Sequence, residues 1–267
     1  MKSSKKLPLP LSNRQETMTT FITEDGSPTL YDSQLGTHYR STQGAKNESY
    51  HVFIKGTRLS SRPAPWHILE MGFGTALNFL QTAQLFLKLF PTETLVYYAI
   101  DWNPITPQIF SQLQYEKLNF PPQLLKLVRD LLTKTTQETQ TTITSHDQRI
   151  QITLFHSAWE DVILPNETKI DALFHDPFAP DINPEAWNKN YFQWAFSLLA
   201  NDGLLATYSA STSVRMAMVD AGFYIAKTRG SGRKREMTIA SPNPSNLSTF
   251  QLLKRDYYLK RIKAKEQ

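Results

Sequence analysis

The segment 67–79, HILEMGFGTALNF, has the residue types of a site that binds a nucleoside. A short apolar run ends in Glu70, and Gly72 and Gly74 follow before a stretch that can begin a helix. Glycines let a strand turn sharply into a helix while the backbone approaches a ligand closely. The carboxylate of Glu70 disfavours a bound phosphate, because the two anions would repel each other. The G-x-G-x-x-G pattern of a dinucleotide site is incomplete, because Leu77 takes the place of its third glycine. The pattern E-x-G-x-G favours a cationic or zwitterionic nucleoside such as S-adenosylmethionine, and the alternative is a tight turn without a ligand.

Further cofactor contacts are expected where later strands end. Asp101 follows the apolar run 95–100 and is placed to accept hydrogen bonds from ribose hydroxyls. Trp159 follows the run 150–155, where an adenine can stack on it, although tryptophan is equally common in protein cores. The predicted cofactor-binding residues are Glu70, Gly72, Phe73, Gly74, Thr75, Asn78, Asp101, Trp102, Ser157, Ala158, Trp159 and Asp176.

The triplet Asp176-Pro177-Phe178 is the predicted catalytic segment. An amine that accepts a methyl group must present its lone pair, so acceptors have to hold its N–H bonds without blocking that lone pair. The Asp176 carboxylate and nearby carbonyl groups can serve as those acceptors, and Phe178 offers a face for a base. The alternative is a strand that ends at a proline and is followed by a buried phenylalanine.

Two basic groups suggest a polyanionic partner. The first contains Arg229, Arg233, Lys234 and Arg235, and the second, at 254–265, is interleaved with Tyr257 and Tyr258. Such groups are either solvated surface or a nucleic-acid contact. The predicted substrate-binding residues are Tyr39, Ser41, Phe178, Tyr208, Arg233, Lys234 and Arg235.

An alternation of strands and helices positions these residues. Strands are expected at 67–71, 95–100, 150–155, 170–174, 203–208, 223–228 and 236–240. Helices are expected at 75–90, 106–118, 124–132, 184–200 and 213–221, and the Thr/Gln-rich segment 133–148 is expected to be an exposed linker or loop. This alternation predicts an α/β fold with a seven-stranded, mostly parallel sheet whose last strand is antiparallel, the architecture of Rossmann-like methyltransferases.

The remaining segments complete the predicted domain organisation. Residues 1–16 are expected to be a flexible leader, and 17–62 a β-rich N-terminal module with strands at 19–23, 29–31 and 50–54. The methyltransferase domain is expected at 63–243 and a basic C-terminal tail at 244–267.

Composition limits the function classes. The chain has 267 residues, 40% of them hydrophobic, with a net charge of +5 and no cysteine, which excludes disulfides and thiolate metal sites. No apolar run is long enough for a membrane span and no secretory signal is visible, so cytoplasmic residence is expected, without membrane or metal.

Several segments together resemble a known family. They are GFGTALNF, HDPFAPDINPEAWN, LLANDGLLATYSASTSVRMAMVDAGF, GSGRKREM and, nearer the N-terminus, TEDGSPTLYDSQLGTHYRSTQGAKNESYHVFI. Over residues 20–241 the chain resembles the methyltransferase half of the MnmC family, which makes 5-methylaminomethyl-2-thiouridine at the wobble base of certain tRNAs. The resemblance implies S-adenosylmethionine as methyl donor, tRNA as partner, and the primary amine of 5-aminomethyl-(2-thio)uridine as acceptor.

The chain departs from the family pattern in three places. Ala76 stands where glycine is common, which is expected to be a mild change inside the helix start, and His156-Ser157 replaces a common Gly-Asp. A second glycine fingerprint for a flavin-dependent oxidase is absent. The expectation is a stand-alone methyltransferase that receives its aminomethyl substrate from a separate enzyme. The rival hypotheses are methylation of a small-molecule or protein amine, and a non-catalytic RNA-binding protein.

Overall fold

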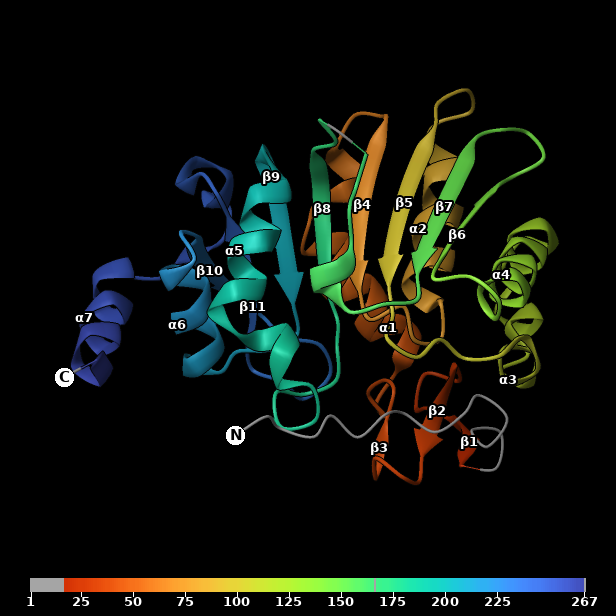
Figure 1. Cartoon of the computed structure of the whole chain (residues 1–267), viewed down its shortest axis with the longest axis horizontal. Helices are drawn as coiled ribbons and strands as arrows, with labels where there is room; N and C mark the ends of the chain where they lie inside the picture. Colours follow the sequence, from red (N-terminus) through yellow and green to blue (C-terminus); the bar gives the residue numbers. More distant parts are fainter. Residues whose placement is uncertain (1–16, 166, 267) are drawn as a thin grey trace.

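The computed structural model describes residues 17–165 and 167–266, which form one large mixed sheet flanked by helices and one small antiparallel sheet (Figure 1). The predicted leader, 1–16, lies outside the described residues. The predicted α/β class with a mostly parallel sheet is confirmed.

The large sheet has nine strands in the order β12-β10-β11-β9-β8-β4-β5-β7-β6. All seven predicted strands form, and β6 and β12 extend the sheet at its two edges. The strands are β4 (Trp66–Met71), β5 (Leu95–Ile100), β6 (Gln140–Thr144), β7 (Ile150–Phe155), β8 (Ile170–His175), β9 (Leu199–Thr207), β10 (Tyr224–Thr228), β11 (Met237–Ser241) and β12 (Gln251–Leu252).

The centre of the sheet is parallel and its two ends are antiparallel. β4 lies between β5 and β8, so the chain order reverses at β4, and in such sheets a ligand binds beyond the carboxyl ends at that point. The final pair, β10 and β11, is antiparallel as predicted, and β11 is inserted between β10 and β9.

The prediction of a linker or loop at 133–148 is wrong. Helix α4 (Pro122–Thr135) continues into it, and β6 pairs antiparallel with β7. Its β-branched residues suit a half-buried strand: Thr141 is buried, while the hydroxyls of Thr142 and Thr153 meet across the strands at 2.9 Å. The polar composition reflects an edge strand with one face toward solvent.

The helix predicted at 184–200 is shorter than expected. A 3-10 turn, η6 (Pro184–Trp187), precedes α5 (Lys189–Leu198), whose N-terminus is capped by the Asn188 side chain. The turn signal Asn201-Asp202-Gly203 lies inside β9, where the register with β8 is irregular. A side chain at Gly203 would come within 2.8 Å of a β8 carbonyl, so the glycine serves a close backbone approach.

The other helices follow the predicted alternation with shifted ends. The helix expected at 106–118 divides into α3 (Pro107–Gln112) and η4 (Tyr115–Leu118), because Gln114 between them adopts a left-handed conformation. The remaining helices are α2 (Leu77–Leu89), η5 (Trp159–Asp161), α6 (Thr212–Asp220), η7 (Pro244–Leu247) and α7 (Arg255–Glu266).

The N-terminal segment combines a small sheet with a helical stretch. Strands β1 (Met18–Ile22), β2 (Pro28–Asp32) and β3 (Thr37–His38) form the sheet. The strand predicted at 50–54 is wrong, because α1 (Ala45–Ser49) continues as a π-helix, η2 (Tyr50–Lys55). After a turn, the 3-10 helix η3 (Leu59–Ser61) follows. Three consecutive apolar residues there are all buried, a pattern that does not distinguish a buried strand from a buried helix.

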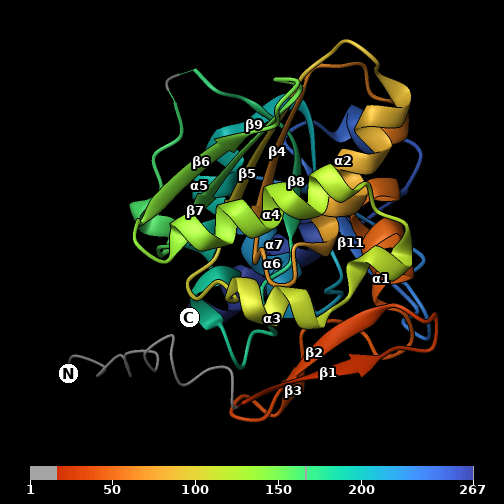
Figure 2. The same cartoon turned by 90° about the vertical axis from the view of Figure 1, so that its right-hand side faces the viewer.

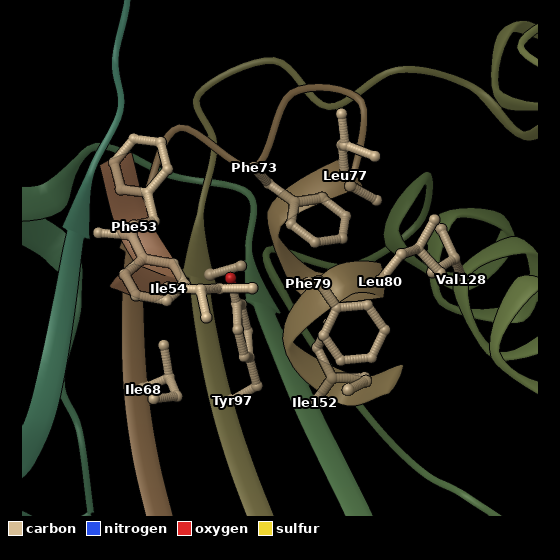
Figure 3. Close-up of a cluster of buried hydrophobic side chains, with 14 of the residues drawn as sticks. Phe53, Ile54, Ile68, Phe73, Leu77, Phe79, Leu80, Tyr97, Val128 and Ile152 are labelled. Atoms are coloured by element: carbon tan, nitrogen blue, oxygen red, sulfur yellow. The ribbon is translucent and has the colours of Figure 1, made fainter. Parts of the chain in front are cut away.

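Alternate residues of the central strands face two separate cores. Ile68 belongs to the core under α2 and α4, whereas its neighbour Leu69 belongs to the core under α5 and α6. In the first core, Phe79 of α2 packs edge-on against Tyr97 of β5 with ring centroids 5.1 Å apart (Figure 3). Figure 2 shows α4 crossing that face of the sheet, with β1–β3 apart from it.

The segment predicted as a basic tail is folded where the structure describes it. Strand β12 pairs with β10, and helix α7 follows. Tyr258 of α7 is buried in the second core, whereas Tyr257 is half exposed with Arg261 over its ring. The side chain of Lys265 lies outside the described residues. The predicted domain boundaries at 62 and 243 stay predictions.

Candidate active site

A cavity of about 1240 Å³ opens at the carboxyl ends of the parallel strands. In Figure 1 the arrowheads of β5 and β9 point toward the small sheet β1–β3, and residues of both regions line this cavity. Typical small-molecule pockets measure about 300–1,000 Å³, so this cavity has room for a nucleoside cofactor and an acceptor group together.

The loop between β4 and α2 forms one wall and depends on backbone conformations that glycine supplies. Gly72 has φ +91°, and a β-carbon there would lie 2.5 Å from the carbonyl oxygen of Asp176. Gly74 has φ +51° and donates its N–H to Oδ2 of Asp101 at 2.8 Å. Both glycines line the cavity, so the loop brings bare backbone to a ligand, as a nucleoside site requires.

Ala76 also adopts a left-handed conformation, with φ +63°, immediately before helix α2. The expectation that Ala76 lies inside the start of the helix is therefore wrong. Ala76 is the residue that precedes the helix, where glycine is favoured because a β-carbon is strained at positive φ.

Asp101 directly follows β5 and lines the cavity. Its Oδ2 accepts the Gly74 N–H, and its Oδ1 accepts the N–H of Asn103 at 2.8 Å. Each carboxylate oxygen has two acceptor positions, so Asp101 can hold this loop and still accept ribose hydroxyls. Trp102 beside it also lines the cavity and is 47% exposed.

After β7, Ser157 and Ala158 line the cavity together with Trp159. The indole of Trp159 is only 8% exposed and packs against Tyr191 and Trp194, with ring centroids 5.6 and 5.5 Å away. Most of Trp159 is thus a core side chain, and the exposed indole at this end of the cavity is Trp102.

Asp176 lies at the centre of a buried polar network. Its Oδ2 pairs with the guanidinium of Arg40 and accepts a hydrogen bond from Asn78 Nδ2 at 2.9 Å. Burial raises the pKa of Asp176 to about 7, and the charge of Arg40 opposes this rise. The Asp176 side chain is 9% exposed and lines the cavity.

Glu70 lies behind the cavity wall. Tyr97 donates its hydroxyl to Oε2 at 2.8 Å, and Asn78 Nδ2 donates to Oε1 at 2.7 Å. Burial raises the pKa of Glu70 to about 8, so its carboxyl is mostly protonated at neutral pH. Phe73, Thr75 and Asn78 are likewise buried, so in this structure these four predicted cofactor contacts support the cavity wall from behind.

The predicted catalytic and substrate residues gather next to the glycine loop. Tyr39 and Phe178 meet edge to face with ring centroids 5.0 Å apart, and the hydroxyl of Tyr208 donates to the carbonyl of Pro177 at 2.8 Å. The cavity lining includes Tyr39, Ser41, Asp176, Pro177, Phe178 and Tyr208. The carbonyl of Phe178 also accepts the indole N–H of Trp187 at 2.8 Å, which fixes the start of the loop after β8.

The β10–β11 turn reaches the cavity through Arg233 and Lys234, while Arg235 is exposed outside the lining. Lys234 has partners within the protein. Its Nζ is 2.9 Å from Oε1 of Glu48 in α1 and 4.6 Å from the centre of the Tyr208 ring. The backbone N–H of Arg233 donates to Oε1 of Gln43 at 2.7 Å, so the turn is attached to the N-terminal segment.

Residues of the site that sequence reasoning does not reveal come mainly from the N-terminal segment. Arg40 lies far from Asp176 in the sequence, and no motif links the two. The lining residues outside the predictions include Arg40, Gln43, Glu48, Asn103, Asn183 and Glu185. The charged pair formed by Glu48 and Lys234 leaves no sequence signal for the same reason.

Among the described residues, no helix is both long and apolar enough to cross a lipid bilayer. Within the same residues, no group of three or more His, Asp or Glu side chains is arranged to hold a metal ion.

Comparisons with known proteins agree with this geometry. Residues 122–243 match a family described as S-adenosyl-L-methionine-dependent methyltransferases. The tRNA 5-methylaminomethyl-2-thiouridine biosynthesis bifunctional protein MnmC of Marinomonas sp. is 31% identical over 83% of this chain and 33% of its own length. The protein of that name from Actinobacillus pleuropneumoniae is 34% identical over 78% of this chain and 33% of its own length.

A solved structure supports the same relationship. The crystal structure of MNMC2 from Aquifex aeolicus is 25% identical, with a TM-score of 0.64, and the match covers 84% of this chain and 70% of that one. The chain spans about a third of the length of the curated relatives it matches. By family match, relatives and fold, the chain belongs to the S-adenosyl-L-methionine-dependent methyltransferases and is related to the methyltransferase half of MnmC.

Proposed function

We propose that the protein methylates the primary amine of 5-aminomethyl-(2-thio)uridine at the wobble position of tRNA, with S-adenosylmethionine as donor. The observation that carries this proposal is the wall formed by Asp176, Phe178 and Tyr39, which lies directly beside the glycine loop in one cavity. A carboxylate beside two aromatic rings suits an amine carried on a base, because the rings can contact the base while the carboxylate holds an N–H bond. The names of the MnmC relatives support the choice of substrate.

The chain's residues fit the cofactor. Gly72 and Gly74 present backbone without side chains to the cavity, where a nucleoside can lie against it, and Asp101 can hold the ribose. Carboxylates of Asp101, Glu160 and Glu185 line the cavity and favour a cationic ligand. When bound, the cofactor supplies a methyl group carried on a sulfonium sulfur. After transfer of the methyl group, the sulfur remains in the cofactor product as a neutral thioether.

The protein's part in the reaction is positioning. Gly72, Gly74 and Asp101 hold one reactant, while Asp176 and the aromatic wall hold the other. Holding two reactants in line contributes about 7–11 kcal/mol to catalysis in favourable cases. Arg233 and Arg235 of the β10–β11 turn are exposed and available to tRNA phosphates, and a separate enzyme is proposed to supply the aminomethyl group.

The test is methyl transfer to defined tRNAs. The purified protein is incubated with labelled S-adenosylmethionine and tRNA carrying 5-aminomethyl-2-thiouridine, and nucleosides are analysed by mass spectrometry. Conversion to the methylaminomethyl nucleoside is expected, with no label in an unmodified transcript of the same tRNA. If the protein binds cofactor by calorimetry yet leaves this tRNA unmethylated, the acceptor assignment is wrong. Transfer to free amines without tRNA would favour the small-molecule or protein alternative.

A further inference from the structure

Arg40 is a buried charge at the reacting end of the cavity. It follows β3, is 7% exposed, and lines the cavity beside Asp176. Its guanidinium pairs with Oδ2 of Asp176, lies 3.9 Å from Oε1 of Glu70 and sits over the ring of Phe53 at 5.8 Å. Guanidinium groups remain protonated in proteins, so a permanent positive charge stands where the acceptor amine is proposed to bind.

The contacts of Asp176 leave its two oxygens unequal. Arg40 and Asn78 both bind Oδ2. In the described part of the chain, no residue donates a hydrogen bond to Oδ1. Because the side chain lines the cavity, Oδ1 is the oxygen left to accept an N–H from a bound amine.

An acceptor amine is reactive only without its extra proton, and this creates a charge problem. An isolated carboxylate beside the amine would stabilise the ammonium form, which has no lone pair. The charge of Arg40 cancels that of Asp176, so the carboxylate can accept a hydrogen bond without adding net negative charge. Burial raises the pKa of Asp176 even with Arg40 present, so loss of Arg40 would raise it further.

The other charged and titratable groups near this pair do not replace Arg40. Glu70 and Glu48 are acidic, and Lys234, which also acts on Asp176, is already paired with Glu48. The pKa of each tyrosine nearby is raised by burial, so all remain neutral near pH 7. The groups facing the pair are Glu48, Glu70, Tyr97, Tyr115, Tyr208 and Lys234.

We propose that Arg40 is a positioning residue for methyl transfer: it anchors Oδ2 of Asp176, leaves Oδ1 to accept an N–H of the acceptor amine, and cancels the carboxylate charge so that the amine binds in its neutral form. This inference rests on the proposed function of the site. Arg40 itself neither gives nor takes a proton, and the proton released from the methylated nitrogen passes to solvent.

Three variants test the proposal. Arg40→Gln removes the charge, Arg40→Lys keeps it, and Arg40→Gln combined with Asp176→Asn removes both charges of the pair. Turnover of the modified tRNA is measured from pH 6 to pH 9, and cofactor affinity by calorimetry. The ionisation of Asp176 is followed by carbon-13 NMR of its carboxyl group, a readout that does not depend on activity.

In Arg40→Gln, the ionisation midpoint of Asp176 and the pH midpoint of kcat should both rise by at least about one unit. Turnover at pH 7 should fall at least about fivefold and recover toward pH 9, with cofactor affinity changed less than about threefold. Arg40→Lys should keep the wild-type pH midpoint at lower kcat. The double variant should lose the upward pH shift and be less impaired at pH 7 than Arg40→Gln.

A folded Arg40→Gln protein with wild-type midpoints in both measurements would overturn the proposal. A double variant whose pH midpoint of kcat is shifted as far as that of Arg40→Gln would overturn the proposal as well. If Arg40→Gln does not fold, the double variant is compared with Arg40→Lys instead, and an upward shift in the double variant alone would overturn the proposal. A wild-type protein inactive on the tRNA would contradict the proposed function alone, since the NMR midpoint still reports whether Arg40 controls the charge of Asp176.

Discussion

Asp101 illustrates how one residue serves both the fold and the ligand. Its two oxygens hold the backbone at Gly74 and Asn103, and the same carboxylate faces the cavity. Its contribution to binding therefore has a direct part, from ribose hydroxyls, and an indirect part, from the shape of the glycine loop.

The first prediction follows from this double role. Asp101→Ala should weaken S-adenosylmethionine binding by about 1–3 kcal/mol, because the substitution removes both the charged acceptor and the loop anchor. Calorimetric titration of the folded variant measures this change. Asp101→Asn, which keeps one carbonyl acceptor, is the control and should bind with intermediate affinity. Wild-type affinity in Asp101→Ala would remove the ribose assignment.

The second prediction concerns backbone strain at Ala76. Ala76→Gly should leave the free energy of unfolding within about 1 kcal/mol of the wild-type value, because relief of the strain at φ +63° offsets the loss of the buried methyl group and the greater backbone freedom of glycine. Urea unfolding measures the change. The matched control is Ala83→Gly within helix α2, which should lower stability by about 1 kcal/mol or more. Equal destabilisation by both substitutions would contradict the positive φ at Ala76.

The third prediction concerns His175, which is buried and neutral. Its Nε2–H donates to the Ala186 carbonyl at 2.7 Å, and burial lowers its pKa from 6.5 to about 3. The unfolded chain binds a proton below pH 6.5 and the folded chain does not, so stability falls as pH falls through this range. From pH 8 to pH 5 the wild type should lose about 2 kcal/mol more than His175→Asn.

Chemical unfolding of both proteins at each pH gives that difference. The raised pKa values of Glu70 and Asp176 act in the opposite direction, since protonation of those carboxyls favours the folded state. Their effect is common to both proteins and cancels in the comparison. Identical pH slopes for wild type and variant would show that His175 is not held neutral by the fold.

At the scale of elements, the β10–β11 turn is part of the cavity and also a connection between distant parts of the chain. Lys234 pairs with Glu48 of α1, and Gln43 accepts the backbone N–H of Arg233. The cations of the turn consequently have different partners. Lys234 is engaged inside the protein, while the exposed side chains of Arg233 and Arg235 are available to a polyanion.

The fourth prediction separates these roles. Replacing Arg233 and Arg235 by Ala should weaken tRNA binding and reduce its salt dependence by about 0.7–0.9 log units for each phosphate that the protein no longer neutralises. Cofactor affinity should not change. Removing two other exposed cations, Lys126 and Lys134 of α4, serves as the control and should leave the salt slope unchanged. A wild-type slope in the turn variant would place the tRNA interface elsewhere.

Helices and strands are predictable from sequence where the local pattern of apolar and polar residues fits only one kind of element. The buried strand 95–100 forms where it is predicted, because an apolar run between turn signals specifies it directly. Strand β6 escapes prediction because polar β-branched residues on an edge strand resemble a loop in composition. A π-helix forms at Tyr50–Lys55 where a strand is predicted, because three adjacent apolar residues fit either structure.

For the whole molecule, the wall of the site that follows strand ends is predictable from local patterns, whereas the ion pairs that join the N-terminal segment to that wall are not. Gly72, Asp101 and Asp176 are adjacent in space because parallel strands end at one edge. Arg40 reaches Asp176 through tertiary packing alone, and no local pattern encodes that ion pair. The same limit applies to Glu70, whose place behind the wall depends on Asn78 and Tyr97.

The pairing of β4 with β8 has a consequence for synthesis on the ribosome. Arg40 and Glu70 are translated long before β8, which brings the Asp176 carboxylate to them. A nascent chain that ends before β8 lacks one of the two neighbours of β4 and lacks Asp176, the carboxylate that pairs with Arg40, so burying that guanidinium would be costly. The early segment should therefore remain open and sensitive to protease until β8 emerges, and become protected in one late step during translation.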